Sequence, residues 1–132
     1  MIQGVITLII SDSTCQTLIG QSGSTYKVFP TVAPQDTAKP YVTIRRTGEL
    51  SAIVKNEASQ LDTPVINITA YAKEYKTAYD ILAAIRTVID NYEGTSESVV
   101  YKKVWYINSQ DMFDKEDDSH VIIDTYNARV SR

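Results

Sequence analysis

The sequence has few of the residues on which catalytic and metal sites depend. Its 132 residues include one cysteine, Cys15, and one histidine, His120. A lone cysteine cannot form an intrachain disulfide, and a zinc site needs several cysteine or histidine ligands. The five glycines are scattered, so the chain has no glycine-rich phosphate-binding loop. These absences predict a protein that uses no metal and no cofactor.

The chain also lacks a basic excess and a long apolar run. The sequence has thirteen lysines and arginines and sixteen acidic residues, which gives a net charge of −3. This balance argues against a dedicated nucleic-acid binder, although DNA could pass such a surface without being held. The apolar N-terminal run has no basic start and is too short to span a bilayer. We expect a protein that is cytoplasmic when it is made, without membrane contact.

Tyrosine is the residue type that is most clearly over-used. The sequence has nine tyrosines, against two phenylalanines and one tryptophan. A tyrosine combines a large apolar ring with a polar tip, which suits protein–protein interfaces. It suits half-buried positions of a sheet equally well, so both interpretations stay open.

Hydrophobic periodicity divides the chain into a few elements. Helical spacing over residues 2–10, a break at 11–13 and renewed spacing up to Gly20 predict a helix followed by a shorter helical stretch. Residues 26–29 predict a short strand that ends at Pro30. The three prolines of residues 30–40 exclude an interior strand there. Residues 41–47 alternate in polarity and predict a strand.

The second half of the chain is more regular. Residues 65–71 predict a strand, and residues 75–92 predict a strongly amphipathic helix that ends at Gly94. Residues 99–108 and 121–130 predict an antiparallel hairpin. The order is α-β-β-β-α-β-β. It predicts an α+β fold: an antiparallel sheet of about five strands with two helices packed on one face.

Strict alternation gives the last two strands large apolar groups on both faces. A sheet with helices on one side should have a polar outer face. We therefore expect a partner to cover part of the outer face.

Two polar segments are long enough to have a function. Residues 48–63 carry a small apolar island and predict either an extended hairpin arm or a solvated loop. The acidic run from Asp111 to Asp118 has three interpretations: a cation-binding loop, a solvated hairpin tip, or an acidic patch for a basic partner or against DNA. Its spacing is not that of an EF-hand, which favours the hairpin tip.

Three short motifs flank the proline-rich segment: Phe29-Pro30, Ala33-Pro34-Gln35 and Pro40-Tyr41-Val42. They resemble the signature of the tail-completion, or tail terminator-like, proteins of siphophages and gene transfer agents. The following elements agree in order, with Gly48 closing a strand and Gly94 closing the long helix. The resemblance covers nearly the whole chain and implies one tail terminator-like domain over residues 1–132.

Members of that family form homo-hexameric rings. A ring caps the tail tube, ends its growth and joins it to the neck connector, while its lumen continues the DNA channel. The resemblance thus implies a structural virion protein and no enzyme. Its implied partners are further copies of the chain, the tail tube protein and a neck connector or stopper protein, with DNA passing unbound.

Two alternatives remain at this point. The chain could be a head-completion or stopper protein on the connector side of the neck. It could also be a small hydrolase or ligand-binding domain that uses His120 or the acidic run.

A ring implies that edge strands and the 48–63 segment contact neighbouring subunits. From the strands we expect Tyr41, Arg45, Trp105 and Tyr106 at the subunit or partner interface. From the 48–63 segment we expect Leu50, Ile53 and Val54. Asp114, Glu116, Asp117 and Asp118 form a candidate acidic patch that faces the lumen or a neighbouring ring.

Overall fold

The structure is a computed structural model that describes residues 2–22, 25–34, 37–54, 57–97, 99–116 and 118–131. The side chains of residues 21–25 and 47–63 and of Ile2 and Ser131 lie outside the description. Three helices are described: α1 (Ile2–Ile10), α2 (Ser13–Ile19) and α3 (Tyr75–Ile89). The strands are β1 (Gln21–Ser22), β2 (Thr25–Tyr26), β3 (Val28–Pro30), β4 (Tyr41–Val54), β5 (Glu57–Ala72), β6 (Gly94–Ser96), β7 (Val99–Asp114) and β8 (Ser119–Ser131).

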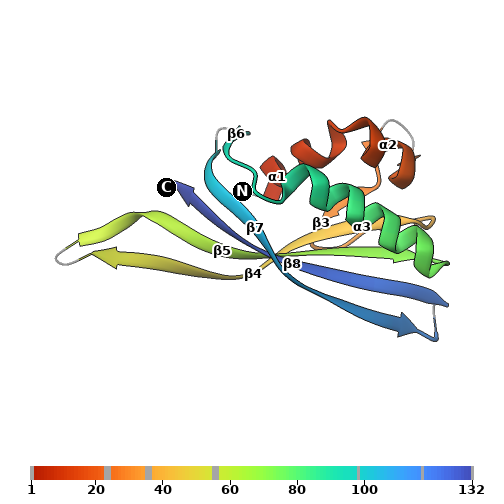
Figure 1. Cartoon of the computed structure of the whole chain (residues 1–132). Helices are drawn as coiled ribbons and strands as arrows, with labels where there is room; N and C mark the ends of the chain where they lie inside the picture. Colours follow the sequence, from red (N-terminus) through yellow and green to blue (C-terminus); the bar gives the residue numbers. More distant parts are fainter. Residues whose placement is uncertain are drawn as a thin grey trace.

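One curled sheet carries the fold, and the helices lie on one of its faces (Figure 1). Its six strands run in the order β3-β4-β5-β8-β7-β6, while β1 and β2 form a separate two-stranded sheet. All neighbours in the large sheet are antiparallel except β3 and β4, which are parallel. The predicted α+β class and the one-sided helical layer are confirmed. The numbers differ in detail: about five strands and two helices were predicted, and the described residues form three helices and a six-stranded main sheet.

The core lies between the helices and the inner face of the sheet. Ile44 of β4 faces Ile68 of β5, and both are fully buried. Further apolar side chains of the same alternation complete this face: Val42, Ile66, Ala70, Ala72, Ile122, Tyr126, Ala128 and Val130. The buried side chains of β4, β5 and β8 thus follow the period-two alternation of a strand with one buried face.

Helix α3 supplies the largest part of the helical layer. Its buried residues repeat at steps of three and four: Ala78, Ile81, Leu82, Ile85 and Ile89. The helix ends at Ile89, earlier than the predicted Tyr92, because Asp90 is already extended (φ −66°, ψ 129°). The N–H of Asn91 and the C=O of Tyr92 instead bond to the backbone of Val104. Gly94 begins β6, so its role as a helix stop was predicted wrongly.

The two N-terminal helices close the layer. Asp12 lies between them and accepts a hydrogen bond from the backbone N–H of Cys15 at 3.0 Å, which caps α2. Gly4 lets α1 approach β6 and β7 closely. A Cβ at Gly4 would lie 2.5 Å from the Tyr101 hydroxyl and 2.9 Å from the Ser96 carbonyl oxygen. The predicted helix, break and second short helix are thus confirmed.

The 48–63 segment belongs to the sheet. β4 and β5 pair from Tyr41↔Tyr71 out to Val54↔Glu57, and register shifts follow Arg46 and Ser51. Gly48 therefore lies inside a strand and does not close it. Of the two interpretations, the backbone supports the extended hairpin arm, which projects beyond the helical layer in Figure 1.

Two bulges in β7 change which side chains share a face. Register shifts lie between Tyr101 and Lys103 and between Tyr106 and Asn108. They place Tyr101, Val104 and Tyr106 all on the inner face, opposite Val130, Ala128 and Tyr126. Strict alternation had split these three side chains between two faces. The apparent apolarity of both faces of β7 thus came in part from unrecognised bulges.

Within the described ranges, no helix combines the length and apolarity needed to cross a membrane.

Replacing Ile68 by alanine tests the core. Ile68 is fully buried at the centre of the inner face, so its truncation should lower the free energy of unfolding by about 3 kcal/mol. Val32 is 73% exposed, and Val32→Ala should change stability by less than about 0.5 kcal/mol. Urea unfolding of both variants measures the difference, and equal effects would contradict this assignment of the core.

Candidate functional site

A buried carboxylate stands in the middle of the apolar inner face. Asp124 of β8 pairs in register with Ile68, and its side chain is fully buried. Arg86 of α3 donates from Nη2 to Asp124 Oδ2 at 3.2 Å. A buried carboxylate without a cation would be strongly unfavourable. This ion pair therefore fixes how α3 is placed over the sheet.

The aromatic ring of Tyr106 lies against the Arg86 guanidinium. Its central carbon lies 3.9 Å from the ring centroid of Tyr106, which contacts Tyr126 edge-on at 5.7 Å. Burial lowers the pKa of Arg86, but the hydrogen bond and the charge of Asp124 outweigh burial and leave it raised. Burial and the nearby Asp124 carboxylate also raise the pKa of Tyr126. Arg86 therefore stays charged and Tyr126 stays neutral across the physiological range.

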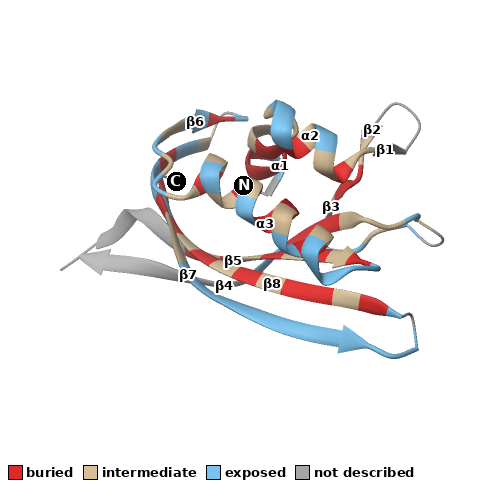
Figure 2. Cartoon of the chain, turned by 45° about the vertical axis from the view of Figure 1, so that its right-hand side comes forward, coloured by how far each residue is buried: buried red, intermediate tan, exposed pale blue. Residues whose placement is uncertain are grey.

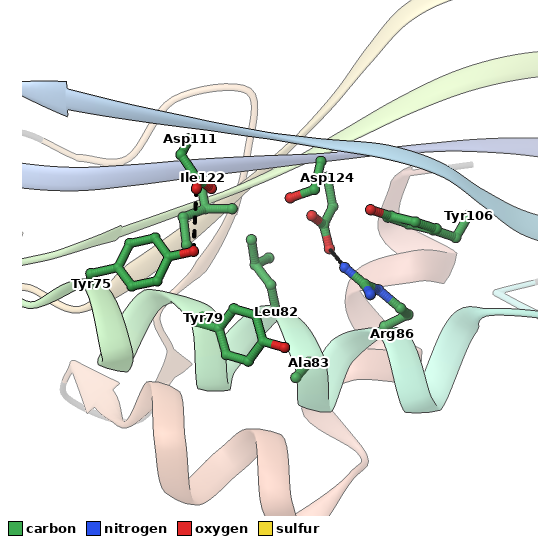
Figure 3. A pocket seen from close by; sticks show the side chains of 10 residues that line it. Tyr75, Tyr79, Leu82, Ala83, Arg86, Tyr106, Asp111, Ile122 and Asp124 are labelled. Atoms are coloured by element: carbon green, nitrogen blue, oxygen red, sulfur yellow. Dashed lines mark hydrogen bonds and ion pairs between the residues drawn. The ribbon is translucent and has the colours of Figure 1, made fainter.

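A cavity of about 320 Å³ opens beside this ion pair, between α3 and the strands β7 and β8 (Figure 3). Tyr75 and Tyr79 line it from the helix, and Ser109 and Asp111 line it from β7. The Tyr75 hydroxyl donates to Asp111 Oδ2 at 3.2 Å and bridges the mouth. The lining is aromatic and polar, which is a composition suited to protein contacts.

Two buried polar atoms at the cavity have no hydrogen-bond partner among the described residues: Arg86 Nε and Asp124 Oδ1. One is a donor and the other an acceptor, and they belong to the same ion pair. A small rotation to the bidentate geometry common for arginine and aspartate would satisfy both atoms. The two atoms therefore give no reason to place a ligand here.

A row of aromatic rings runs across the end of the sheet near this cavity. Tyr79 stacks on Tyr75 at 6.2 Å, Tyr75 meets His120 edge-on at 6.1 Å, and His120 lies 4.8 Å from Phe113. Tyr75, Tyr79 and Phe113 are 44%, 55% and 49% exposed. His120 thus packs between two aromatic rings, as expected for a structural histidine. We call these four residues the aromatic row.

The outer face of the sheet is hollowed by a groove of about 360 Å³. Arg45, Asn67 and Tyr71 line it together with Ile123 of β8 and Met112 at the end of β7. The Thr125 hydroxyl donates to Asn67 Oδ1 at 3.0 Å across two strands. This face is mixed in polarity, and it is less apolar than strict alternation had predicted.

The predicted contact residues do not form one patch. Tyr41 stacks on Tyr71 at 4.7 Å, and Arg45 is exposed in the groove. Trp105 pairs with Asn127 on the outer face, whereas Tyr106 pairs with Tyr126 on the inner face. Leu50, Ile53 and Val54 lie in the arm, and their side chains are outside the described residues.

The predicted acidic patch lies at the end of the β7–β8 hairpin. Asp114 ends β7, and Glu116 and Asp118 are exposed in the turn, while Asp117 lies outside the described residues. The Asp114 carboxylate accepts a hydrogen bond from the Glu116 N–H at 3.1 Å, which orders the turn. No group of three or more potential metal ligands gathers among the described residues. The hairpin-tip interpretation therefore describes the run best.

Sequence reasoning did not identify the Arg86–Asp124 pair. Amphipathic spacing alone places Arg86 on the polar side of α3, and strand alternation alone gives Asp124 no partner. A usable signal existed: Asp124 follows Ile122 and precedes Tyr126 on the buried alternation, and a carboxylate there requires a cation.

Comparison with known proteins agrees with the fold and gives the family. The sequence profile of the family "Tail completion protein gp17" matches residues 3–131. The chain belongs to this family of phage tail completion proteins. It is therefore a structural virion component and not an enzyme, which confirms the resemblance seen in the proline motifs.

Solved structures show the same fold at low identity. A chain from a structure described as the virion of a native gene transfer agent particle is 20% identical. The match covers 98% of this chain and 93% of that one, with a TM-score of 0.77. A second solved chain is 12% identical, with 98% and 96% covered and a TM-score of 0.62. No curated protein sequence matches the chain.

Removing the cation tests the Arg86–Asp124 pair of this tail completion protein. Arg86→Met leaves Asp124 buried and unpaired, so the free energy of unfolding should fall by about 3 kcal/mol. Lys76→Met removes an exposed pair with Asp80, in which the lysine side chain is 84% exposed, and should cost under about 1 kcal/mol. Thermal and urea unfolding compare the two variants. Equal losses would show that Asp124 is not held in a buried environment.

Cys15 gives a test of the helical layer. Burial, reinforced by Asp12, raises the pKa of its thiol from 9.0 to about 12. The thiolate fraction at pH 8 should be roughly a thousand-fold below that of a free thiol. A thiol reagent should therefore leave the folded protein unmodified and react once the protein is unfolded in urea. Rapid labelling without urea would mean that α2 does not pack as described.

Proposed function

We propose that this tail completion protein forms a homo-oligomeric ring, a hexamer, that caps the tail tube and ends its growth. The ring joins the tube to the neck connector, and DNA passes through its lumen. Family membership supports a place in the tail. The ring, its size and its position at the neck are the finer part of the proposal.

The main support for a ring is that the subunit has two hairpins at opposite ends of its body. The β4–β5 arm leaves one end, and the β7–β8 hairpin leaves the other (Figure 1). A subunit with two different contact surfaces at opposite ends assembles head to tail. Such heterologous contacts give a closed ring when the rotation between neighbours divides a full turn.

The charge of the chain suits a DNA channel. The net charge is −3, and exposed Asp114, Glu116 and Asp118 gather at the hairpin tip. Carboxylates that face a lumen repel the phosphate backbone, so DNA slides past without being held. The same patch could instead meet a basic surface of the adjacent ring. In either position the acidic tip acts by charge and not by catalysis.

Loss of the chain in a producing strain tests the capping role. Without a cap the tube has free ends, so particles should show headless tails with a broad, lengthened distribution. Negative-stain microscopy measures tail length, and supplied wild-type chain should restore one length. Headless tails of normal length, together with tailless heads that leak DNA, would contradict the terminator and support the stopper position on the connector side.

A further inference from the structure

Strand β7 has an edge that is only partly covered. β6 pairs with its first residues, Val99 to Tyr101. Further along, Val104 bonds to the backbone of Asn91 and Tyr92, and the N–H of Tyr106 donates to Asp90 Oδ1 at 3.0 Å. From Asn108 to Asp114 no described strand pairs with that side of β7. Figure 2 shows this outer half of β7 as exposed.

The register gives the direction of the backbone groups along this edge. The backbone groups of Val104 and Tyr106 that make these hydrogen bonds point away from β8. The pairs Val104–Ala128 and Tyr106–Tyr126 are therefore non-hydrogen-bonded pairs of the β7–β8 ladder. After the bulge, Asn108 pairs with Thr125, and the alternation continues. The backbone N–H and C=O groups of Ser109, Asp111 and Phe113 therefore point outward. They form a template for one more strand.

Apolar side chains at the same end of the sheet also lack cover. Met112 is 53% exposed and Phe113 is 49% exposed. Tyr75 and Tyr79 extend the aromatic row from α3 toward the same edge. An open edge beside exposed aromatic rings indicates a protein partner. We call the 108–114 edge together with the aromatic row the acceptor edge.

The β4–β5 arm, at the other end of the molecule, also has a strand edge that is only partly covered. β3 pairs only with Val42 to Ile44, so residues 45–54 of β4 extend beyond it. β8 pairs with β5 as far as Leu61, so only the outer part of the arm projects as a two-stranded ribbon in Figure 1. Two-stranded ribbons are marginally stable in water unless a third strand or another surface supports them. The arm thus offers a free strand that gains stability from a partner sheet.

The lengths of the two edges make a second copy of this chain the fitting partner. The seven residues of the 108–114 edge extend over about 23 Å, and the ten residues 45–54 over about 33 Å, so the arm can cover the edge. The same chain therefore supplies both a strand edge long enough to donate and an open edge to accept it.

We infer that the β4 strand of the arm of one copy adds to the β7 edge of the next copy, so that the sheets continue from subunit to subunit. The arm of one copy then covers the aromatic row of the next. This inference rests on the proposed ring and names the contact that builds it.

Cysteine cross-linking tests the contact directly. Gln110→Cys is combined with a cysteine at each of residues 45–54 in turn, which scans every register. Buried Cys15 does not interfere. Mild oxidation of assembled rings should give a ladder of covalent multimers for a few neighbouring arm positions, ending at the ring size. Lys102→Cys, on the part of β7 beside β6, serves as the matched control and should give no ladder.

The outcomes separate the inference from the proposed function. Rings that form but cross-link at none of the ten positions would overturn the arm-to-edge contact and leave the ring intact. Arm cysteines that cross-link only to tail tube protein would also overturn it, because the arm would then serve the tube. If no ring forms in solution or on tail tubes, the proposed function itself fails.

A proline variant gives a second measurement. Ser109→Pro removes an outward N–H and leaves the β7–β8 ladder in place, and Ser109→Ala is its control. The protein should stay folded by circular dichroism. The concentration for half-maximal ring formation should rise roughly tenfold, the loss expected for one hydrogen bond at the contact. Unchanged assembly of Ser109→Pro would overturn the pairing at this edge.

Discussion

The helices cover part of one face of the sheet, and the β4–β5 arm projects beyond them (Figure 1). The core beneath the helices is centred on Ile44 and Ile68, whereas the outer half of β7 is exposed and must face solvent or a partner. One core that carries a projecting arm and an open strand edge is the constraint from which the proposed assembly follows.

The Arg86–Asp124 pair gives this small core a fixed geometry. Aliphatic contacts under α3 would tolerate small sliding movements, because they have little directionality. The ion pair, the Tyr106 ring over Arg86 and the edge-on contact with Tyr126 set one position for the helix. The direction in which the β7–β8 hairpin leaves the body depends on that position. A subunit that must repeat the same angle around a ring benefits from such a directional contact.

The sequence predicted the parts of the fold that depend on regular periodicity. Alternation identified Ile66, Ile68 and Ala70, and helical spacing identified the buried residues of α3. It failed at the bulges of β7, because one extra residue reverses the alternation and no local residue marks it. It did not reveal that Gly48 lies inside a strand. It also missed the pairing of Arg86 with Asp124, because the partners are 38 positions apart and only the fold brings them together.

A reconstruction of the intact tail and neck by electron cryo-microscopy tests the central claim most directly. The account predicts a closed ring of six copies at the head-proximal end of the tail tube. In that ring each β4–β5 arm lies along the β7 edge of the next copy, and the acidic hairpin tips face the lumen or the adjacent ring. A chain seated on the connector side, or a ring whose arms point away from neighbouring copies, would contradict it.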